Sequence, residues 1–368
     1  LDLQGCQTLS RLRGIGRYSM ALARGIITNA GDHEVYVGVS AATPETIAPI
    51  KDALADVLPA ERFKVWASVE PTGWFDPRNA DRFRLAQVAR EAFLDRLNFD
   101  IVHCSSVVEG MADNAVTSIR EHFLGAPTAA TLYDLIPALY PKDYLQHPLS
   151  ERWFRTQLGA LRRADLLLAI SDSAATEAAE LLGIPRTKIV NIRGAADSIF
   201  VPRTFTAVEE AELRAKFRLP KPFVLYSGGL DQRKNVAGLI EAFAMLPTKL
   251  RDSHQIGIVG ASHSEAVDDL QRIATAAGLA PGQVSFTGYV TDDEIVSLYN
   301  LAAAFAFPSH HEGFGLPPLE AMSCGTPTIA ANNSSMPEVV GLPEALFDSR
   351  DPAALQAKLL RVLTDGEF

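Results

Sequence analysis

Short apolar segments alternate with longer segments of mixed polarity along the chain. The apolar segments end at glycine, proline or small polar residues, which is typical of buried parallel strands. The longer segments repeat apolar positions with helical periodicity, so the pattern predicts an α/β protein built from βα units. Strands are predicted at residues 1–3, 34–40, 63–68, 100–104, 128–132, 166–170, 188–192, 223–226, 256–260, 284–287, 301–307 and 326–331. Helices are predicted at residues 14–28, 44–58, 78–97, 145–163, 172–182, 207–217, 236–246, 292–301, 317–322 and 352–363.

Residues 202–222 interrupt this alternation with a proline-bounded segment that contains the charged helix predicted at 207–217. A chain of 368 residues suggests two domains on a prior of roughly 150 residues each. We therefore interpret residues 202–222 as a crossover between two halves of the chain. The predicted domains are residues 1–199 and 200–368.

The composition is that of a soluble globular protein, with 47% apolar and 21% charged residues. A formal net charge of −10 argues against a nucleic-acid partner, because polyanion binding depends on Lys and Arg contacts. The three cysteines are widely spaced and form no C-x-x-C pair, so buried thiols in a reducing compartment are predicted. The apolar runs fall far short of the roughly 20 residues that span a bilayer. The chain starts without Met and stops soon after residues 352–363, which is typical of a sequence cut at both ends.

The segment 303–341 has the clearest organisation for binding a ligand. Its apolar strand ends at Pro308, a polar loop follows, and a helix then begins with two prolines in its first turn. Open α/β sheets bind ligands at the carboxyl ends of their strands, where helix N-termini also favour anions. Glu312 on the loop and Glu320 on the helix lie eight positions apart. Two acceptor-only carboxylates suit the paired hydroxyls of a sugar or a ribose.

A second candidate segment, residues 227–235, follows the strand predicted at 223–226. It contains Gly229 in a glycine turn and the adjacent cations Arg233 and Lys234 at the start of a helix. Positive charge at a helix N-terminus interacts unfavourably with the helix dipole. An anion bound between the cations and the helix would offset this repulsion, because Arg can make bidentate contacts with it and Lys supplies a point charge. We therefore predict a phosphate site here.

The sequence EGFGLPPLE at Glu312–Glu320, followed by AMSCGTPTI, resembles the E-x7-E motif of retaining, nucleotide-sugar-dependent glycosyltransferases of family 4. The resemblance implies the GT-B fold, in which two Rossmann-like domains face a cleft. Residues 1–199 would then bind the acceptor, and residues 200–368 would bind the nucleoside-diphosphate sugar. It also implies transfer with retention of anomeric configuration and no metal ion or other cofactor.

The resemblance assigns roles to individual residues of this chain. Arg233 and Lys234 would neutralise the leaving diphosphate, Glu312 would position the donor hexose, and Glu320 would hold the ribose hydroxyls. The predicted catalytic set is Asp134, Arg233, Lys234 and Glu312. The predicted donor-binding set is Gly14, Gly16, Gly229, Tyr289, Val290, Gly313, Phe314, Gly315, Leu316 and Glu320.

The first half of the chain carries weaker signals. Residues 4–13 are predicted to form a polar loop between the strand at 1–3 and the helix at 14–28. The resemblance places the loop with Gly14 and Gly16 over the donor phosphates and the acceptor. Three basic residues in this region either meet an anionic acceptor or form a solvated loop, and these are Arg11, Arg13 and Arg17. Tyr133 stands where relatives often carry His. The neighbouring Asp134 either holds sugar hydroxyls or ends the strand at 128–132 as a turn residue.

For the substrate, GDP-mannose is the first hypothesis and a UDP-hexose the second. The expected acceptor is a glycan or lipid-linked glycan of bacterial surface polysaccharide. The expected place is the cytoplasm, with peripheral contact to the inner membrane. Two other classes stay open. A glycoside hydrolase also uses paired carboxylates but needs no phosphate cations, and a non-catalytic sugar-nucleotide-binding module would fit Tyr133 in place of His. A metal site at His310-His311-Glu312 is disfavoured because sequence neighbours rarely converge on one ion.

Overall fold

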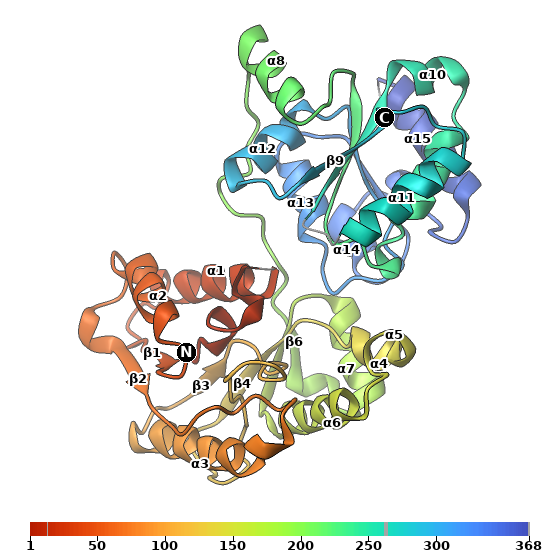
Figure 1. The fold of residues 1–368 in the computed structure, drawn as a ribbon. Helices are drawn as coiled ribbons and strands as arrows, with labels where there is room; N and C mark the ends of the chain where they lie inside the picture. The colour runs from red at the N-terminus through yellow and green to blue at the C-terminus, as the bar shows by residue number, and fades with distance from the viewer. Residues whose placement is uncertain (13, 261–263, 367–368) are drawn as a thin grey trace. The chain divides into compact units, whose positions relative to one another are not determined.

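The computed structural model describes residues 1–12, 14–260 and 264–366. The chain divides into two compact units, Leu1–Gly194 and Ala195–Phe368 (Figure 1). Each unit contains parallel β-structure accompanied by helices, so the predicted α/β class is confirmed. The predicted domain boundary lies a few residues later in the chain, after Ile199.

The first unit contains four parallel strands in the order β3-β4-β5-β6 and a parallel pair, β1-β2. Their bounds are β1 Val37–Ser40, β2 Phe63–Trp66, β3 Val102–Cys104, β4 Thr128–Leu132, β5 Leu166–Ala169 and β6 Ile189–Asn191. Asp2 joins the two parts through parallel bridges to Gly38 and Cys104. The segment around Asp2 therefore lies between β1 and β3, as the first strand does in a doubly wound sheet.

The helices of the first unit follow the predicted alternation. They are α1 Gly14–Thr28, α2 Ile47–Leu54, α3 Ala80–Arg96, α4 Ile136–Leu139, α5 Pro141–Tyr144, α6 Pro148–Arg163 and α7 Asp172–Leu182. Helix α7 shows why the ends of a helix can be predicted from the sequence. The Ser171 hydroxyl accepts the Ala174 N–H at 2.9 Å as the N-cap. Gly183 ends the helix in the left-handed region, with φ +67°.

A buried ion pair holds the segment around Asp2 in the sheet. The Arg90 guanidinium on α3 donates from Nε to Asp2 Oδ2 at 2.8 Å. The Gln4 amide donates to the same carboxylate at 3.1 Å and to the Val116 carbonyl at 2.7 Å. A buried charge is tolerated only when it is paired and hydrogen-bonded, and both conditions hold for Asp2 and Arg90.

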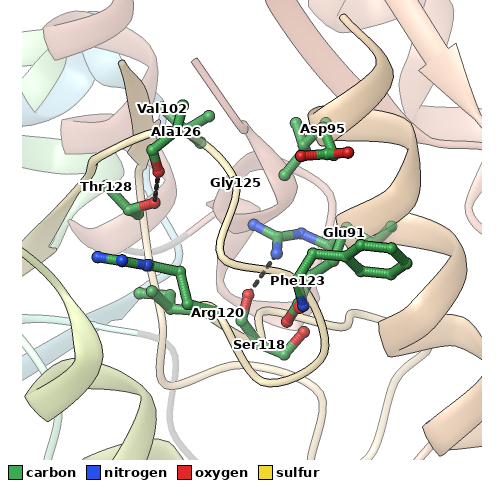
Figure 2. A pocket seen from close by; sticks show the side chains of 12 residues that line it. Glu91, Asp95, Val102, Ser118, Arg120, Phe123, Gly125, Ala126 and Thr128 are labelled. Carbon is green, nitrogen blue, oxygen red and sulfur yellow. Dashed lines mark hydrogen bonds between the residues drawn. The ribbon is translucent and has the colours of Figure 1, made fainter. Parts of the chain in front are cut away.

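Figure 2 shows a pocket in this unit, lined by α3 and by the first residues of β3 and β4. Within it, the Glu91 carboxylate accepts backbone N–H groups of Glu121, His122 and Phe123 at 3.1, 2.7 and 3.0 Å. Burial raises the pKa of Glu91, but these hydrogen bonds outweigh it and hold the pKa below its ordinary value. The pocket lies at the amino ends of the strands, so we assign it to the structure of the unit rather than to ligand binding.

The second unit contains a six-stranded parallel sheet in the order β12-β11-β10-β7-β8-β9. Its strands are β7 Phe223–Ser227, β8 Gln255–Val259, β9 Val284–Gly288, β10 Ala304–Phe307, β11 Thr328–Ala331 and β12 Leu346–Phe347. Its helices are α8 Ala207–Lys216, α9 Val236–Ala244, α10 Thr248–Ser253, α11 Ser264–Ala276, α12 Asp292–Leu301, α13 Leu316–Ser323, α14 Met336–Val340 and α15 Pro352–Thr364. All residues of β7, β8, β10 and β11 are buried, which explains their continuous apolar sequences.

The structure corrects three predicted segments. Residues 4–13 were expected to form a polar loop, but Gln4–Thr8 is buried and its polar side chains bond inward, with Gln7 Nε2 donating to Ser40 O at 2.9 Å. The helix predicted at 44–58 is limited to α2, because a 3₁₀ turn at Pro44–Thr46 precedes it. The strand predicted at 301–307 begins at Ala304, since Leu301 still belongs to α12. Helices α4, α5, α10, α11 and α14 and strand β12 were not predicted.

Candidate functional site

The strand order of the second unit defines where a ligand is expected. Strands β7 and β10 are neighbours, and the order runs to β8 and β9 on one side and to β11 and β12 on the other. The loops that leave the carboxyl ends of β7 and β10 therefore diverge at a topological switch point, which is the usual ligand position in open α/β sheets. These two loops carry Arg233, Lys234 and Glu312.

The structure brings these three residues into direct contact. Lys234 Nζ lies 2.7 Å from Glu312 Oε1, and Arg233 Nη1 lies 3.3 Å from the same oxygen. The Arg233 guanidinium also donates to the His311 carbonyl and lies 3.7 Å from Asp231 Oδ1. The three side chains are only 11–15% exposed. The Glu312 carboxylate thus contacts two nearly buried cations, and Asp231 supplies a second negative charge beside Arg233.

The charge of Glu312 follows from this arrangement. Burial would raise the pKa of its carboxyl, but Lys234 and Arg233 outweigh burial and hold that pKa below its ordinary value. Glu312 is therefore an ionised hydrogen-bond acceptor at neutral pH. It has the charge and the acceptor oxygens needed to bind sugar hydroxyls.

The segment after β11 fixes the backbone of the Glu312 loop. Ser334 Oγ accepts the Glu312 N–H at 2.9 Å. The buried Ser335 hydroxyl lies within 3.1 Å of Glu312 O and 2.6 Å of Phe314 O, to which it donates. Neither serine was predicted to belong to the site, because their contacts join segments more than twenty residues apart.

Gly315 precedes α13 in a backbone conformation that favours glycine, with φ +110°. A Cβ at this position would lie 2.2 Å from Met336 Cε on α14. Phe314 and Gly313 beside it are buried, and Leu316 is half-buried. The loop therefore reaches the helix without space for a side chain at residue 315.

Glu320 lies on α13 and is held from the side of α12. The Tyr299 hydroxyl donates to Glu320 Oε2 at 3.0 Å and lies 2.7 Å from the Ser227 hydroxyl at the end of β7. Tyr299 is buried, and burial followed by the nearby Glu320 charge raises its pKa, so it remains a neutral donor. The helical periodicity of residues 292–301 predicted that Tyr299 lies on a helix, but nothing in the sequence predicted its contact with Glu320.

The other predicted donor residues of this unit lie on loops at the same edge of the sheet. Gly229 follows β7, and a Cβ there would lie 3.2 Å from Asp231 Oδ2. Tyr289 and Val290 follow β9, where the Tyr289 side chain is 78% exposed and Val290 is half-buried. Their proposed contacts with the nucleotide stay predictions.

In the first unit, the helix that begins at Gly14 is confirmed. A Cβ on Gly16 would lie 2.4 Å from the Arg11 Cα and carbonyl oxygen, so this glycine permits close packing. Nothing lies within 4 Å of a Cβ built on Gly14. Arg11 and Arg17 are exposed, and Arg13 lies outside the described residues.

Tyr133 and Asp134 both make contacts within the first unit. The Tyr133 hydroxyl lies 2.7 Å from Ser19 Oγ and donates to the Ile15 carbonyl at 3.3 Å, so it holds the first turns of α1. Asp134 Oδ1 accepts the Ile136 N–H at 3.0 Å, in the turn that precedes α4. These contacts agree with the turn interpretation of Asp134, while its role with sugar hydroxyls stays a prediction.

Two family models match the chain. One, described as Glycosyltransferase Family 4, matches residues 12–198, and one described as Glycosyl transferases group 1 matches residues 209–368. The chain therefore belongs to glycosyltransferase family 4, as the motif at Glu312–Glu320 indicated.

The curated relatives include two bacterial mannosyltransferases. The serotype-specific mannosyltransferase WbdA of Escherichia coli is 36% identical over 100% of this chain and 44% of the relative. O-antigen chain mannosyltransferase B of Escherichia coli is 29% identical over 97% of this chain and 88% of the relative. The chain thus spans less than half the length of the WbdA relative.

Solved structures confirm the GT-B fold class. Anabaena HepE in complex with UDP and glucose matches with a TM-score of 0.69 at 20% identity, covering 98% of this chain and 89% of that chain. WaaG, a glycosyltransferase involved in lipopolysaccharide biosynthesis, matches with a TM-score of 0.63 at 16% identity, covering 96% and 88%. At these identities the likeness concerns the fold alone.

Two kinds of feature are absent from the described residues, namely membrane-spanning helices and clusters of metal-binding side chains. Within residues 1–12, 14–260 and 264–366, no helix is both long enough and apolar enough to cross a bilayer. In the same part of the chain, His, Cys, Asp and Glu side chains form no group of three or more suited to a metal ion. The cysteines Cys6, Cys104 and Cys324 are buried free thiols.

We predict that Gly315→Ala costs more stability than a glycine substitution with backbone strain alone. Gly341 is the matched control, because it has φ +69° and nothing within 4 Å of a built Cβ. Gly341→Ala should lower the free energy of unfolding by about 1 kcal/mol. Gly315→Ala has the wider φ of +110°, which alanine tolerates less, and also displaces the end of the buried Met336 side chain, so it should cost about 3 kcal/mol. Equal losses in urea denaturation would show that neither the wider φ nor the Met336 contact adds a cost.

Glu109 gives a prediction for pH. Its buried carboxylate in the first unit accepts hydrogen bonds from Ser106 Oγ at 2.9 Å and Ser10 Oγ at 3.4 Å. Burial raises its pKa from 4.5 to about 7. Between these values the folded carboxyl keeps its proton while the unfolded one ionises, so stability falls as pH rises through the window. At about 1.4 kcal/mol per pKa unit, the fall is about 3 kcal/mol.

The Glu109→Gln variant should remove this contribution, because its side chain does not titrate, so the difference in unfolding free energy between parent and variant should change by about 3 kcal/mol across the window. The buried His103, whose pKa burial lowers to about 4, adds a slope of the opposite sign in both proteins. Unfolding free energies from urea titrations at several pH values between about 4.5 and 7.5 measure the slope. The exposed Glu45→Gln in the same unit is the control and should keep the parent slope. A Glu109→Gln variant that keeps the parent slope would assign the fall to other groups.

Proposed function

We propose that the chain transfers a hexose from a nucleoside-diphosphate sugar to a glycan or lipid-linked glycan acceptor in bacterial surface polysaccharide synthesis. The observation that carries this proposal is the contact of Arg233 and Lys234 with Glu312 at the switch point of the second sheet. Two cations that would bind a diphosphate lie beside an ionised carboxylate that would accept hydrogen bonds from sugar hydroxyls. The family membership and the names of the mannosyltransferase relatives support the same class of reaction.

In the proposed reaction, the bond between the sugar C1 and the β-phosphate oxygen breaks and negative charge grows on the diphosphate. Arg233 and Lys234 stabilise that charge as it develops. Two side-chain cations supply this stabilisation in the way a metal ion would, so we propose a metal-independent reaction. The acceptor hydroxyl forms the new bond at C1 and gives its proton to the departing diphosphate, with the anomeric configuration retained.

Other residues of the second unit would position the donor. Glu312 and the backbone from Gly313 to Leu316 would bind the hexose, because Ser334 and Ser335 already fix this loop. Glu320 would accept the ribose hydroxyls, since Tyr299 fixes one of its oxygens. The loop at Tyr289 would receive the nucleobase.

We propose GDP-mannose as the donor and a UDP-hexose as the second candidate. The mannosyltransferase relatives support mannose. The HepE neighbour, whose structure contains UDP and glucose, is the reason to retain the second candidate. We further propose that the enzyme works in the cytoplasm in peripheral contact with the membrane.

The proposal predicts that one nucleoside diphosphate stabilises the folded protein. Thermal unfolding is measured with GDP, UDP, ADP and dTDP, each with and without magnesium. At a hundredfold excess over Kd, a ligand that binds only the folded state contributes about 2.7 kcal/mol. We expect a shift with GDP that is independent of magnesium and is much smaller in Arg233→Ala at the same ligand concentration.

Other results of this experiment would change the proposed function. A shift with UDP alone would replace the donor. A shift that requires magnesium would contradict metal independence. No shift with any nucleotide at millimolar concentration would contradict the proposal and favour the glycoside hydrolase, for which release of sugar without a nucleotide is the direct test. Binding without any transfer would favour a non-catalytic binding module.

A further inference from the structure

The turn that carries the two cations is also joined to the Glu312 loop by uncharged contacts. Asn235 donates from Nδ2 to the Pro308 carbonyl at 3.2 Å. In the opposite direction, the His310 N–H donates to the Arg233 carbonyl at 2.8 Å. Asn235 Nδ2 also donates to the Ser349 carbonyl at 3.0 Å, in the loop that follows β12. One side-chain amide therefore links three loops at the carboxyl edge of the sheet.

The local backbone is shaped for this amide. Asn235 has φ +53°, a left-handed conformation that Asn adopts more readily than most residues. It stands at the N-cap of α9, where an Asn side chain usually accepts an N–H of the first helical turn. Its side chain makes no such cap bond and instead reaches across to the neighbouring loops. A Cβ on residue 238 would lie 2.4 Å from Asn235 Oδ1, so Gly238 leaves the space that the amide occupies.

The contacts of Asn235 differ in kind from those of its two neighbours. Arg233 and Lys234 use their charged groups to bind the Glu312 carboxylate. A bound diphosphate would compete for those same groups, because it presents anionic oxygens to them. The Asn235 amide binds two backbone carbonyls, which a diphosphate does not displace. This link can persist while the ionic contacts change partner.

We propose that Asn235 is a positioning residue for the diphosphate: it holds the Arg233–Lys234 turn at a fixed distance from the Glu312 loop when the cations exchange Glu312 for the ligand. This inference rests on the proposed function. It assigns Asn235 no contact with the substrate and no part in proton transfer. Its effect on binding is exerted through Arg233 and Lys234.

The test compares ligand binding in Asn235→Gly and in the parent. Glycine tolerates the positive φ, so the substitution removes both amide hydrogen bonds without adding backbone strain. Binding of GDP, or of whichever nucleoside diphosphate stabilises the parent, is measured by calorimetry well below the melting temperature of each variant. We expect about tenfold weaker binding, because a small displacement of charged ligating groups has a large effect.

A double-mutant cycle distinguishes positioning from a general loss of stability. Because Asn235 acts through the cations, Asn235→Gly should weaken binding much less in an Arg233→Ala background than in the parent. Gln283→Ala is the matched control, since this buried amide donates to the Arg251 carbonyl at 2.7 Å and accepts the Ala280 N–H at 2.7 Å, just before β9. The control should lower the melting temperature and leave ligand affinity unchanged.

The possible outcomes separate this inference from the proposed function. Parent-like affinity of Asn235→Gly would overturn the inference, as would an effect of the same size in the Arg233→Ala background. If the glycine variant does not fold, Gly238→Ala displaces the Asn235 amide without adding a charge, because its Cβ would lie 2.4 Å from Asn235 Oδ1, and it decides the question by the same cycle. If the parent binds none of the four nucleoside diphosphates, the proposed function fails and this inference fails with it.

Discussion

The second unit depends on one buried electrostatic constraint, which is that Glu312 must have both Arg233 and Lys234 as partners. Removing three charged groups from water costs several kcal/mol per ion unless they are paired and hydrogen-bonded. Each of these side chains is 15% exposed or less, and Arg233 has a second acidic neighbour in Asp231, 3.7 Å away. An anionic ligand at this place would take over carboxylate contacts that the two cations already make, which links the packing of this edge to the proposed function.

The surrounding elements satisfy this constraint from several directions. The neighbouring positions of β7 and β10 place the cation turn beside the Glu312 loop. Ser334 and Ser335 bind the loop backbone, and the buried Tyr299 fixes one oxygen of Glu320. Hydroxyl groups thus hold the backbone of the Glu312 loop and the Glu320 side chain, in addition to the ionic contacts among Glu312, Arg233 and Lys234. Such preorganisation lowers the cost of arranging charges around a reacting group.

Much of this arrangement could be predicted from the sequence, because strand-ending loops of a parallel sheet share one edge. The alternation placed Arg233 and Glu312 on such loops, and α12 was predicted with the bounds that the structure shows. The contacts of Ser335 and Tyr299 could not be predicted, since they depend on which helices and loops are neighbours in space. Residues 4–8 were assigned to a polar loop for a related reason. Their polar side chains can be buried because they form hydrogen bonds with one another and with the backbone at the strand ends. Hydropathy alone does not predict such hydrogen bonds.

The most direct measurement of the central claim is the effect of Glu312→Gln on transfer and on nucleotide binding in the same protein. The account predicts that hexose transfer falls by about a hundredfold, while affinity for GDP stays the same or rises, because the cations lose the carboxylate that competes with the diphosphate. Glu210→Gln, which removes an exposed partner of Arg214 on α8, should change neither quantity. Parent-like transfer, or a loss of nucleotide affinity as large as the loss of transfer, would contradict the account.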